Sequence, residues 1–209
     1  MPTIRRLTDS CLVVTTDDGA TMLDPGFHTF SAEEVDLNSI GDIQRVLVTH
    51  EHGDHVSVDF VRWLLDRGDD VTVYSNQAVG DLLAQHGIAV VTDTPPGLTV
   101  EDVAHATTPM GTAPPNRSFT VDGILTHPGD SYQPTATAPV LALPLLIPWG
   151  STFESIEFAR RLAPQQAVPI HDFYLSSSGR EWITNIAKAV LAKSEIELVP
   201  LNWGESFAV

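Results

Sequence analysis

Short extended runs of apolar residues, separated by turn residues, occupy the start of the chain. They cover residues 4–8, 11–16 and 21–23. Runs of this length bounded by Asp and Gly predict a meander of three strands. The segment Asp24-Pro25-Gly26 then interrupts the pattern, and Ser31 followed three residues later by Glu34 indicates the start of a helix.

From residue 45 onward, apolar runs of strand length alternate with segments whose apolar residues recur at helical spacing. The expected strands cover residues 45–49, 71–74, 88–91, 98–104, 118–121, 124–126, 140–147, 167–170 and 196–201. The expected helices cover residues 57–67, 77–86, 151–163 and a last segment from about residue 178. Ser151 with Glu154, and Ser178 with Glu181, predict capping boxes for the last two helices. The order of elements favours one α/β domain over residues 1–209, with two sheets covered by helices.

Composition narrows the choice of partner and compartment. The chain has 209 residues and a formal net charge of −16, which repels nucleic acids and anionic membranes. We therefore expect a small-molecule substrate, no nucleic-acid or membrane partner, and at most a homo-oligomer. Cys11 lies in an apolar run and is expected in the core. No apolar stretch is long enough for a membrane span or a signal peptide, so we expect a cytoplasmic protein.

The chemistry is concentrated in one short segment. Three histidines and one aspartate fall between His50 and His55, in the loop between an expected buried strand and an expected helix. His50 and His52 are two residues apart in an extended chain, so both can reach one metal ion. Asp54 and His55 follow Gly53 and can face a second ion. Imidazole and carboxylate ligands suit zinc, and also manganese or iron.

The segment Thr49-His50-Glu51-His52-Gly53-Asp54-His55 resembles the signature of the metallo-β-lactamase superfamily. Three later segments also match the pattern of that superfamily: His105 after the run 98–104, the turn His127-Pro128-Gly129-Asp130, and the segment Val168-Pro169-Ile170-His171. Within the superfamily, the chain is most similar to the branch that contains L-ascorbate-6-phosphate lactonase. The resemblance implies an αββα sandwich, in which two mixed β-sheets pack face to face with helices on the outer faces.

The resemblance also implies seven metal ligands in two sets that share a bridge. They are His50, His52 and His105 for the first ion, Asp54, His55 and His171 for the second, and Asp130 between the two. Two divalent ions, Zn²⁺ before Mn²⁺ or Fe, would hold a bridging hydroxide that hydrolyses a small, anionic ester, lactone or phosphoester. Asp54 and Asp130 are the expected catalytic carboxylates.

Several side chains have alternative interpretations. His127 competes with His105 for the place of third ligand, although its position before Asp130 favours packing behind the site. Four further residues could line the pocket: His28, Tyr132, Trp149 and Asn116.

Two other functions are compatible with the same residues. One is a metal-loaded binding or sensing protein without catalysis. The other is a di-iron oxidoreductase, which is disfavoured because such relatives carry Glu where this chain has His52 and append a flavin domain that 209 residues do not accommodate.

Overall fold

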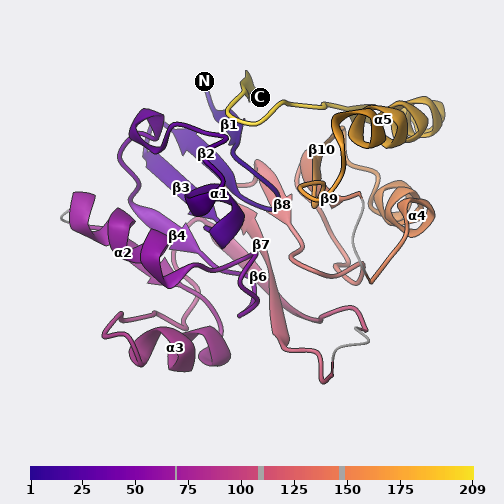
Figure 1. The fold of residues 1–209 in the computed structure, drawn as a ribbon. Helices are drawn as coiled ribbons and strands as arrows, with labels where there is room; N and C mark the ends of the chain where they lie inside the picture. Colours follow the sequence, from indigo (N-terminus) through magenta and orange to yellow (C-terminus); the bar gives the residue numbers. More distant parts are fainter. Residues whose placement is uncertain (69, 108–110, 146–148) are drawn as a thin grey trace.

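The computed structural model describes residues 1–68, 70–107, 111–145 and 149–209 (Figure 1). In these ranges the chain forms two six-stranded mixed sheets with the strand orders β12-β1-β2-β3-β4-β5 and β11-β10-β9-β8-β7-β6. The strands of the first sheet are β1 (Thr3–Arg6), β2 (Leu12–Thr16), β3 (Gly19–Leu23), β4 (Arg45–Leu47), β5 (Thr72–Tyr74) and β12 (Ser206–Ala208). Those of the second are β6 (Leu98–Ala104), β7 (Pro115–Val121), β8 (Leu125–His127), β9 (Val140–Pro144), β10 (Gln166–Ile170) and β11 (Glu197–Leu198).

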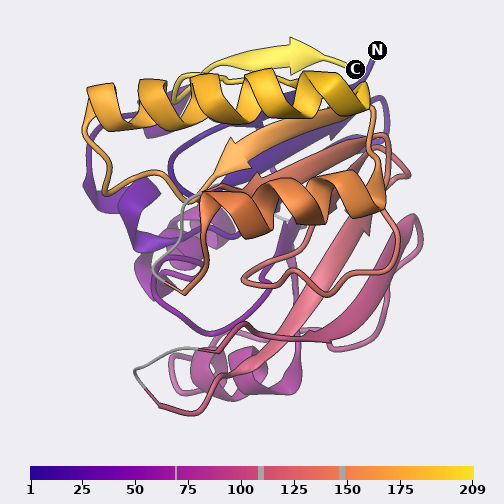
Figure 2. The same cartoon turned by 90° about the vertical axis from the view of Figure 1, so that its right-hand side faces the viewer.

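Helices cover the outer face of each sheet (Figure 1). The first sheet carries α1 (Phe27–Ser31), α2 (Val58–Arg67) and α3 (Gln77–Ala84), and the second carries α4 (Thr152–Leu162) and α5 (Ser177–Leu191). The chain also forms the short 3₁₀ helices η1 (Leu37–Ser39) and η2 (Ala192–Ser194). Figure 2 shows α4 and α5 side by side across the second sheet. The αββα sandwich is therefore confirmed. Within the described ranges, no helix has the length and apolar character needed to cross a membrane.

Three apolar clusters correspond to the layers. The middle one fills the space between the sheets and includes Leu12, Leu47 and Phe119, all essentially inaccessible to solvent. The other two lie between each sheet and its helices. Strand β9 is buried along its whole length, which explains its almost entirely apolar sequence.

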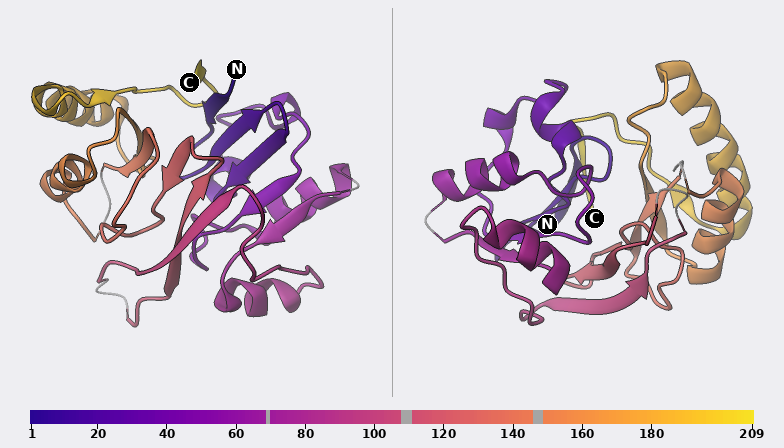
Figure 3. Two further views of the ribbon diagram at one scale, coloured as in Figure 1. Left: turned by 180° about the vertical axis from the view of Figure 1, so that it is seen from behind. Right: turned by 60° about the horizontal axis from the view of Figure 1, so that its bottom comes forward.

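Strand direction determines where the loops meet. Strands β3, β4 and β5 run parallel to one another, as do β8, β9 and β10. Strand β6 is antiparallel to β7, which is antiparallel to β8, so β6 and β8 point the same way. The segments that follow β6, β8 and β10 therefore leave the second sheet at the same end of its strands. The segment that follows β4 leaves the first sheet at the carboxyl end of its parallel strands. In Figure 3 the two chain termini lie beside each other, where β12 pairs with β1.

Several sequence predictions were wrong in detail. The helix expected from Ser31 is absent, because α1 ends there and the Ser31 hydroxyl donates back to the carbonyl of Phe27 at 2.7 Å. The strand expected at 88–91 reduces to one bridge between Tyr74 and Val91. The strand expected at 196–201 is only Glu197–Leu198, since Pro200 lacks a backbone N–H.

The helix boundaries show one further difference. Ser57 and Ser151 cap α2 and α4 as the pattern indicates. Helix α5, however, is capped by Ser176, whose side chain accepts from the N–H of Gly179, and not by Ser178. The strand expected at 140–147 is observed over Val140–Pro144, and residues 146–147 lie outside the described residues.

Candidate metal centre

The loop after β4 carries four of the candidate ligands and packs against the Asp24-Pro25-Gly26 turn. A Cβ atom on Gly26 would lie 1.8 Å from the carbonyl oxygen of Asp54, so only glycine fits there. The same carbonyl accepts from the hydroxyl of Ser10 at 3.0 Å. These contacts fix the path of the loop before any metal binds.

Loops from both sheets bring the candidate ligands together. The ligand atoms of His50, His52, His105 and Asp130 lie within 4.8 Å of one another, and so do those of a second group, Asp54, His55 and His171. The two groups contain the ligand sets that the family resemblance implies, with His105 rather than His127 in the first and Asp130 beside it. His105 directly follows β6, Asp130 lies three residues beyond β8, and His171 directly follows β10.

Asp130 lies between the two groups, and each of its oxygens faces a different one. Its Oδ1 is 2.8 Å from Nε2 of His171 and 3.0 Å from Nε2 of His55. Its Oδ2 is 3.4 Å from Nε2 of His105 and 3.9 Å from Nε2 of His50. A carboxylate in this position can bind two cations at once.

The donor set fits divalent cations. Four buried atoms at this point face one another at short distances without the geometry of a hydrogen bond to any described residue: Nε2 of His55, His105 and His171, and Oδ1 of Asp130. Buried polar atoms are seldom left unsatisfied, and these four converge on the same space. Imidazole nitrogens and carboxylate oxygens in tetrahedral or larger sets are ordinary ligands of zinc, manganese and iron.

The second nitrogen of several rings is held by the surrounding protein. Nδ1 of His55 donates to Oδ2 of Asp24 at 2.7 Å, and Nδ1 of His105 donates to the carbonyl of Ala106 at 2.6 Å. These bonds fix the tautomer and leave Nε2 to face the centre. Asp24 is itself held by the N–H and hydroxyl of Thr49, at 2.8 and 2.9 Å.

The charges of the centre are strongly coupled. Burial and the neighbouring His55 hold the pKa of His50 well below its ordinary value. Burial also opposes charge on His55, yet the carboxylates of Asp130 and Asp24 raise its pKa well above the usual range. Burial opposes ionisation of Asp130, but His171 and His55 hold its pKa well below the usual range. Ionised carboxylates are thus concentrated where a cation would be stabilised.

The turn before Asp130 accounts for two of the ambiguous residues. Nε2 of His127 donates to the carbonyl of Ser10 at 2.9 Å, and its Nδ1 accepts from the N–H of Gly129 at 3.2 Å. Asn116 donates to the carbonyl of Pro128 at 2.9 Å and accepts from the N–H of Asp130 at 3.2 Å. Both side chains therefore stabilise the turn before Asp130 through hydrogen bonds to backbone groups.

The remaining pocket candidates differ in position. The indole N–H of Trp149 donates to Oδ2 of Asp130 at 2.7 Å. The hydroxyl of Tyr132 shares a 2.8 Å hydrogen bond with Ser155, and its ring lies against that of Trp149. His28 is buried, with its ring stacked on Phe173. Trp149 is thus the candidate in direct contact with the centre.

Two carboxylates beside the ligands were missed in the sequence. Asp24 was taken only as part of a turn, although its position after a buried strand was a signal. Asp9, with its Oδ1 3.8 Å from Nδ1 of His171, has no local signature at all. Asp172, the residue after His171, pairs with the buried guanidinium of Arg6.

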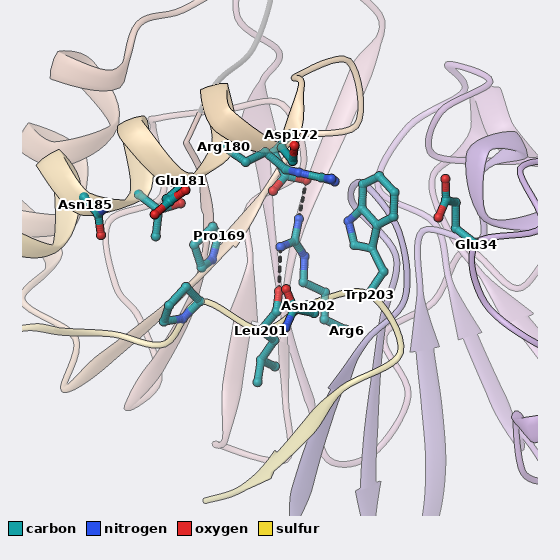
Figure 4. A pocket seen from close by; sticks show the side chains of 13 residues that line it. Arg6, Glu34, Pro169, Asp172, Arg180, Glu181, Asn185, Leu201, Asn202 and Trp203 are labelled. Atoms are coloured by element: carbon teal, nitrogen blue, oxygen red, sulfur yellow. Dashed lines mark hydrogen bonds and ion pairs between the residues drawn. The ribbon is translucent and has the colours of Figure 1, made fainter.

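The pair of Arg6 and Asp172 borders a cavity of about 500 Å³ (Figure 4). Arg6 also donates to the carbonyl of Leu201 at 2.9 Å, and the guanidinium of Arg180 lies 4.0 Å from the ring centre of Trp203. None of the candidate ligands is among the residues that line the cavity. His171 has a φ of 64°, a conformation that is uncommon for residues other than glycine, and it directly precedes Asp172 of this ion pair.

Comparison with known proteins agrees with this geometry. The family model of the metallo-beta-lactamase superfamily matches residues 5–77. Protein Rv0786c of Mycobacterium tuberculosis (strain ATCC 25618 / H37Rv) is 32% identical over 183 residues, with 82% of this chain and 84% of that protein covered.

Solved structures share the fold at lower identity. Igni18, a metallo hydrolase from the hyperthermophilic archaeon Ignicoccus hospitalis KIN4/I, has a TM-score of 0.72 and 18% identity, with 100% of this chain and 99% of that chain covered. The metallo-beta-lactamase fold protein YhfI from Bacillus subtilis has a TM-score of 0.72 and 13% identity, with 99% of each chain covered.

Proposed function

Since the chain belongs to the metallo-beta-lactamase superfamily, we propose that it is a hydrolase with two divalent metal ions that cleaves a small, anionic ester, lactone or phosphoester. The observation that carries this proposal is the position of Asp130, with one oxygen toward each ligand group. Zn²⁺ suits the donor set best, and Mn²⁺ and Fe are the alternatives. The likeness to the L-ascorbate-6-phosphate lactonase branch stays a prediction.

The protein contributes orientation and charge. When bound, the two ions supply an activated water at neutral pH and offset the negative charge that develops on the attacked group. Asp24 holds His55 so that its Nε2 faces the centre. Asp130 holds the two ligand groups in fixed positions relative to each other. Asp54, whose side chain is 31% exposed, is open to solvent at the edge of the centre.

The chain offers an anionic substrate few cationic side chains near the centre. The chain has only 11 Lys and Arg residues, and none lies in the segments 50–55, 126–130 or 168–172. Near the centre, Arg6 is paired with Asp172, and Arg117 bonds to Asp102 and two backbone carbonyls. Neutralising a substrate anion therefore falls to the metal ions.

Metal content is the first test. Protein purified without chelator and loaded with Zn²⁺ should contain about two ions per chain by elemental analysis. His55→Ala removes a ligand of the second group and should lower the ratio toward one. His86→Ala, at an exposed position beyond α3, should leave the ratio unchanged. A wild-type protein that no divalent cation loads would contradict the proposal.

Catalysis is the second test. A panel of lactones, thioesters, phosphodiesters and sugar phosphates is assayed with wild type and Asp130→Asn. The variant should lose far more in kcat than in KM, because the carboxylate positions the reacting groups and not the substrate. If fully loaded wild type turns over none of the panel faster than the variant, a metal-binding protein without catalysis becomes the better explanation.

A further inference from the structure

Trp149 is the one pocket candidate whose polar atom reaches the metal centre. It lies between β9 and α4, two residues before Ser151, the cap of α4. Its indole nitrogen is 2.7 Å from Oδ2 of Asp130, a short N–H to carboxylate hydrogen bond. From the sequence, Trp149 was expected only to line the pocket, so this bond was not predicted.

The bond goes to one particular oxygen. Oδ1 of Asp130 faces Nε2 of His55 and of His171, at 3.0 and 2.8 Å. Oδ2, which accepts from Trp149, faces His105 and His50 at longer distances of 3.4 and 3.9 Å. A carboxylate can rotate about its Cβ–Cγ bond, and a fixed donor on one oxygen limits that rotation.

The indole ring is itself held in place. Its ring centre lies 5.8 Å from that of His105 and 5.3 Å from that of Tyr132. The Tyr132 hydroxyl is anchored on Ser155 at the start of α4. The donor is therefore supported by a helix of the second sheet, independently of the loop that carries His50 and His52.

We propose that Trp149 is a positioning residue, whose indole N–H holds Oδ2 of Asp130 toward the first ligand group and so sets the affinity of that group for its metal ion. The inference rests on the proposed metal-dependent function. Groups that orient a metal ligand typically change affinity about 10- to 100-fold when they are removed. The indole acts on metal affinity through Asp130, by means of the hydrogen bond that its N–H donates.

Two substitutions separate the N–H from the ring. Trp149→Phe keeps an aromatic ring and removes the donor, and Trp149→Ala removes both. If the N–H is responsible, both variants should weaken the first site about tenfold or more in a Zn²⁺ competition titration against a chromogenic chelator. If packing alone matters, Trp149→Phe should bind like wild type. Trp182→Phe, with an exposed indole on α5, is the matched control and should not change affinity.

A second measurement needs no loss of the side chain. In protein labelled with ¹⁵N at its indoles, the N–H resonance of Trp149, assigned by its absence in Trp149→Phe, should shift in Asp130→Asn and on metal loading. The Trp182 resonance should not shift. Wild-type affinity in Trp149→Phe, or a Trp149 resonance indifferent to Asp130→Asn, would overturn the inference. Wild type that binds no metal would instead contradict the proposed function, so the two failures are distinguishable.

Discussion

At the residue scale, two buried histidines of the second sheet, one directly after β6 and one at the end of β8, have opposite roles. His105 leaves its Nε2 unsatisfied toward the centre, whereas both ring nitrogens of His127 are engaged by backbone groups. Their substitution should therefore separate metal binding from stability. His105→Ala should weaken the first site at least about tenfold and leave the fold intact. Competition titration with a chelator measures this loss.

His127→Ala should show the reverse pattern. It should retain about two metal ions, because no ligand is lost. It should also lower the free energy of unfolding by about 1–3 kcal/mol, because the carbonyl of Ser10 and the N–H of Gly129 lose their buried partner. Denaturant unfolding measures the cost. A variant that loses metal but not stability would exchange the roles assigned to the two residues.

The candidate ligands were predictable from sequence because four of them are neighbours and the other three directly follow or lie close to strand ends. Their supporting residues were not. Asp9 and Trp149 are far in sequence from the ligands they approach, at His171 and Asp130. No local pattern identifies a partner that only the fold brings near. The sequence thus indicates which atoms can bind metal, and the structure shows what orients them.

At the scale of elements, predictions held where a helix or strand depends on its own residues. Strand β6 was expected at 98–104 and is observed there. Helix α1 differs because its start is fixed from a distance, through the N–H of Phe27, which donates to the carbonyl of Gly53 at 2.9 Å. Strand β12 was missed because its pairing with β1 joins residues from opposite ends of the chain.

The cap of α5 gives a test at this scale. Ser176→Ala removes the side chain that accepts from the N–H of Gly179 and should lower the free energy of unfolding by about 1 kcal/mol. Ser178→Ala, inside the first turn of the same helix, should change it little. Urea titrations of the two variants compare them directly. An equal loss in both would restore Ser178 as the cap.

At the scale of the whole molecule, a histidine buried in its neutral form makes stability depend on pH. Burial lowers the pKa of His127 below 6.5, even though Asp24 opposes this. In the unfolded chain the same group titrates near 6.5, so as pH falls below that value the unfolded state takes up a proton that the folded state does not. The free energy of unfolding should therefore fall with pH.

The comparison with His127→Asn isolates this contribution, because the other titratable groups near His127, including Asp24, His55 and His171, are common to both proteins. Chemical unfolding from about pH 7 to about pH 5, with chelator present, should show the steeper decline in wild type. Parallel curves would show that His127 is not held neutral.

Because the candidate ligands are divided between the two sheets, metal ions bound there would cross-link the sheets. Residues 50–55 lie in the loop that follows β4 of the first sheet, whereas His105, Asp130 and His171 follow strands of the second. Besides its return after β11 to form β12, which pairs with β1, the chain crosses between the sheets through the largely exposed segment 92–97. A protease site engineered at Pro95-Pro96 would nick this tether. In mild urea, the two fragments should elute together on size exclusion when Zn²⁺ is bound and should separate when Zn²⁺ is chelated. Intact protein is the control: its tether keeps the local concentration of the two halves high, so it should not come apart. Fragments that separate equally well with Zn²⁺ present would show that the ions do not hold the two sheets together.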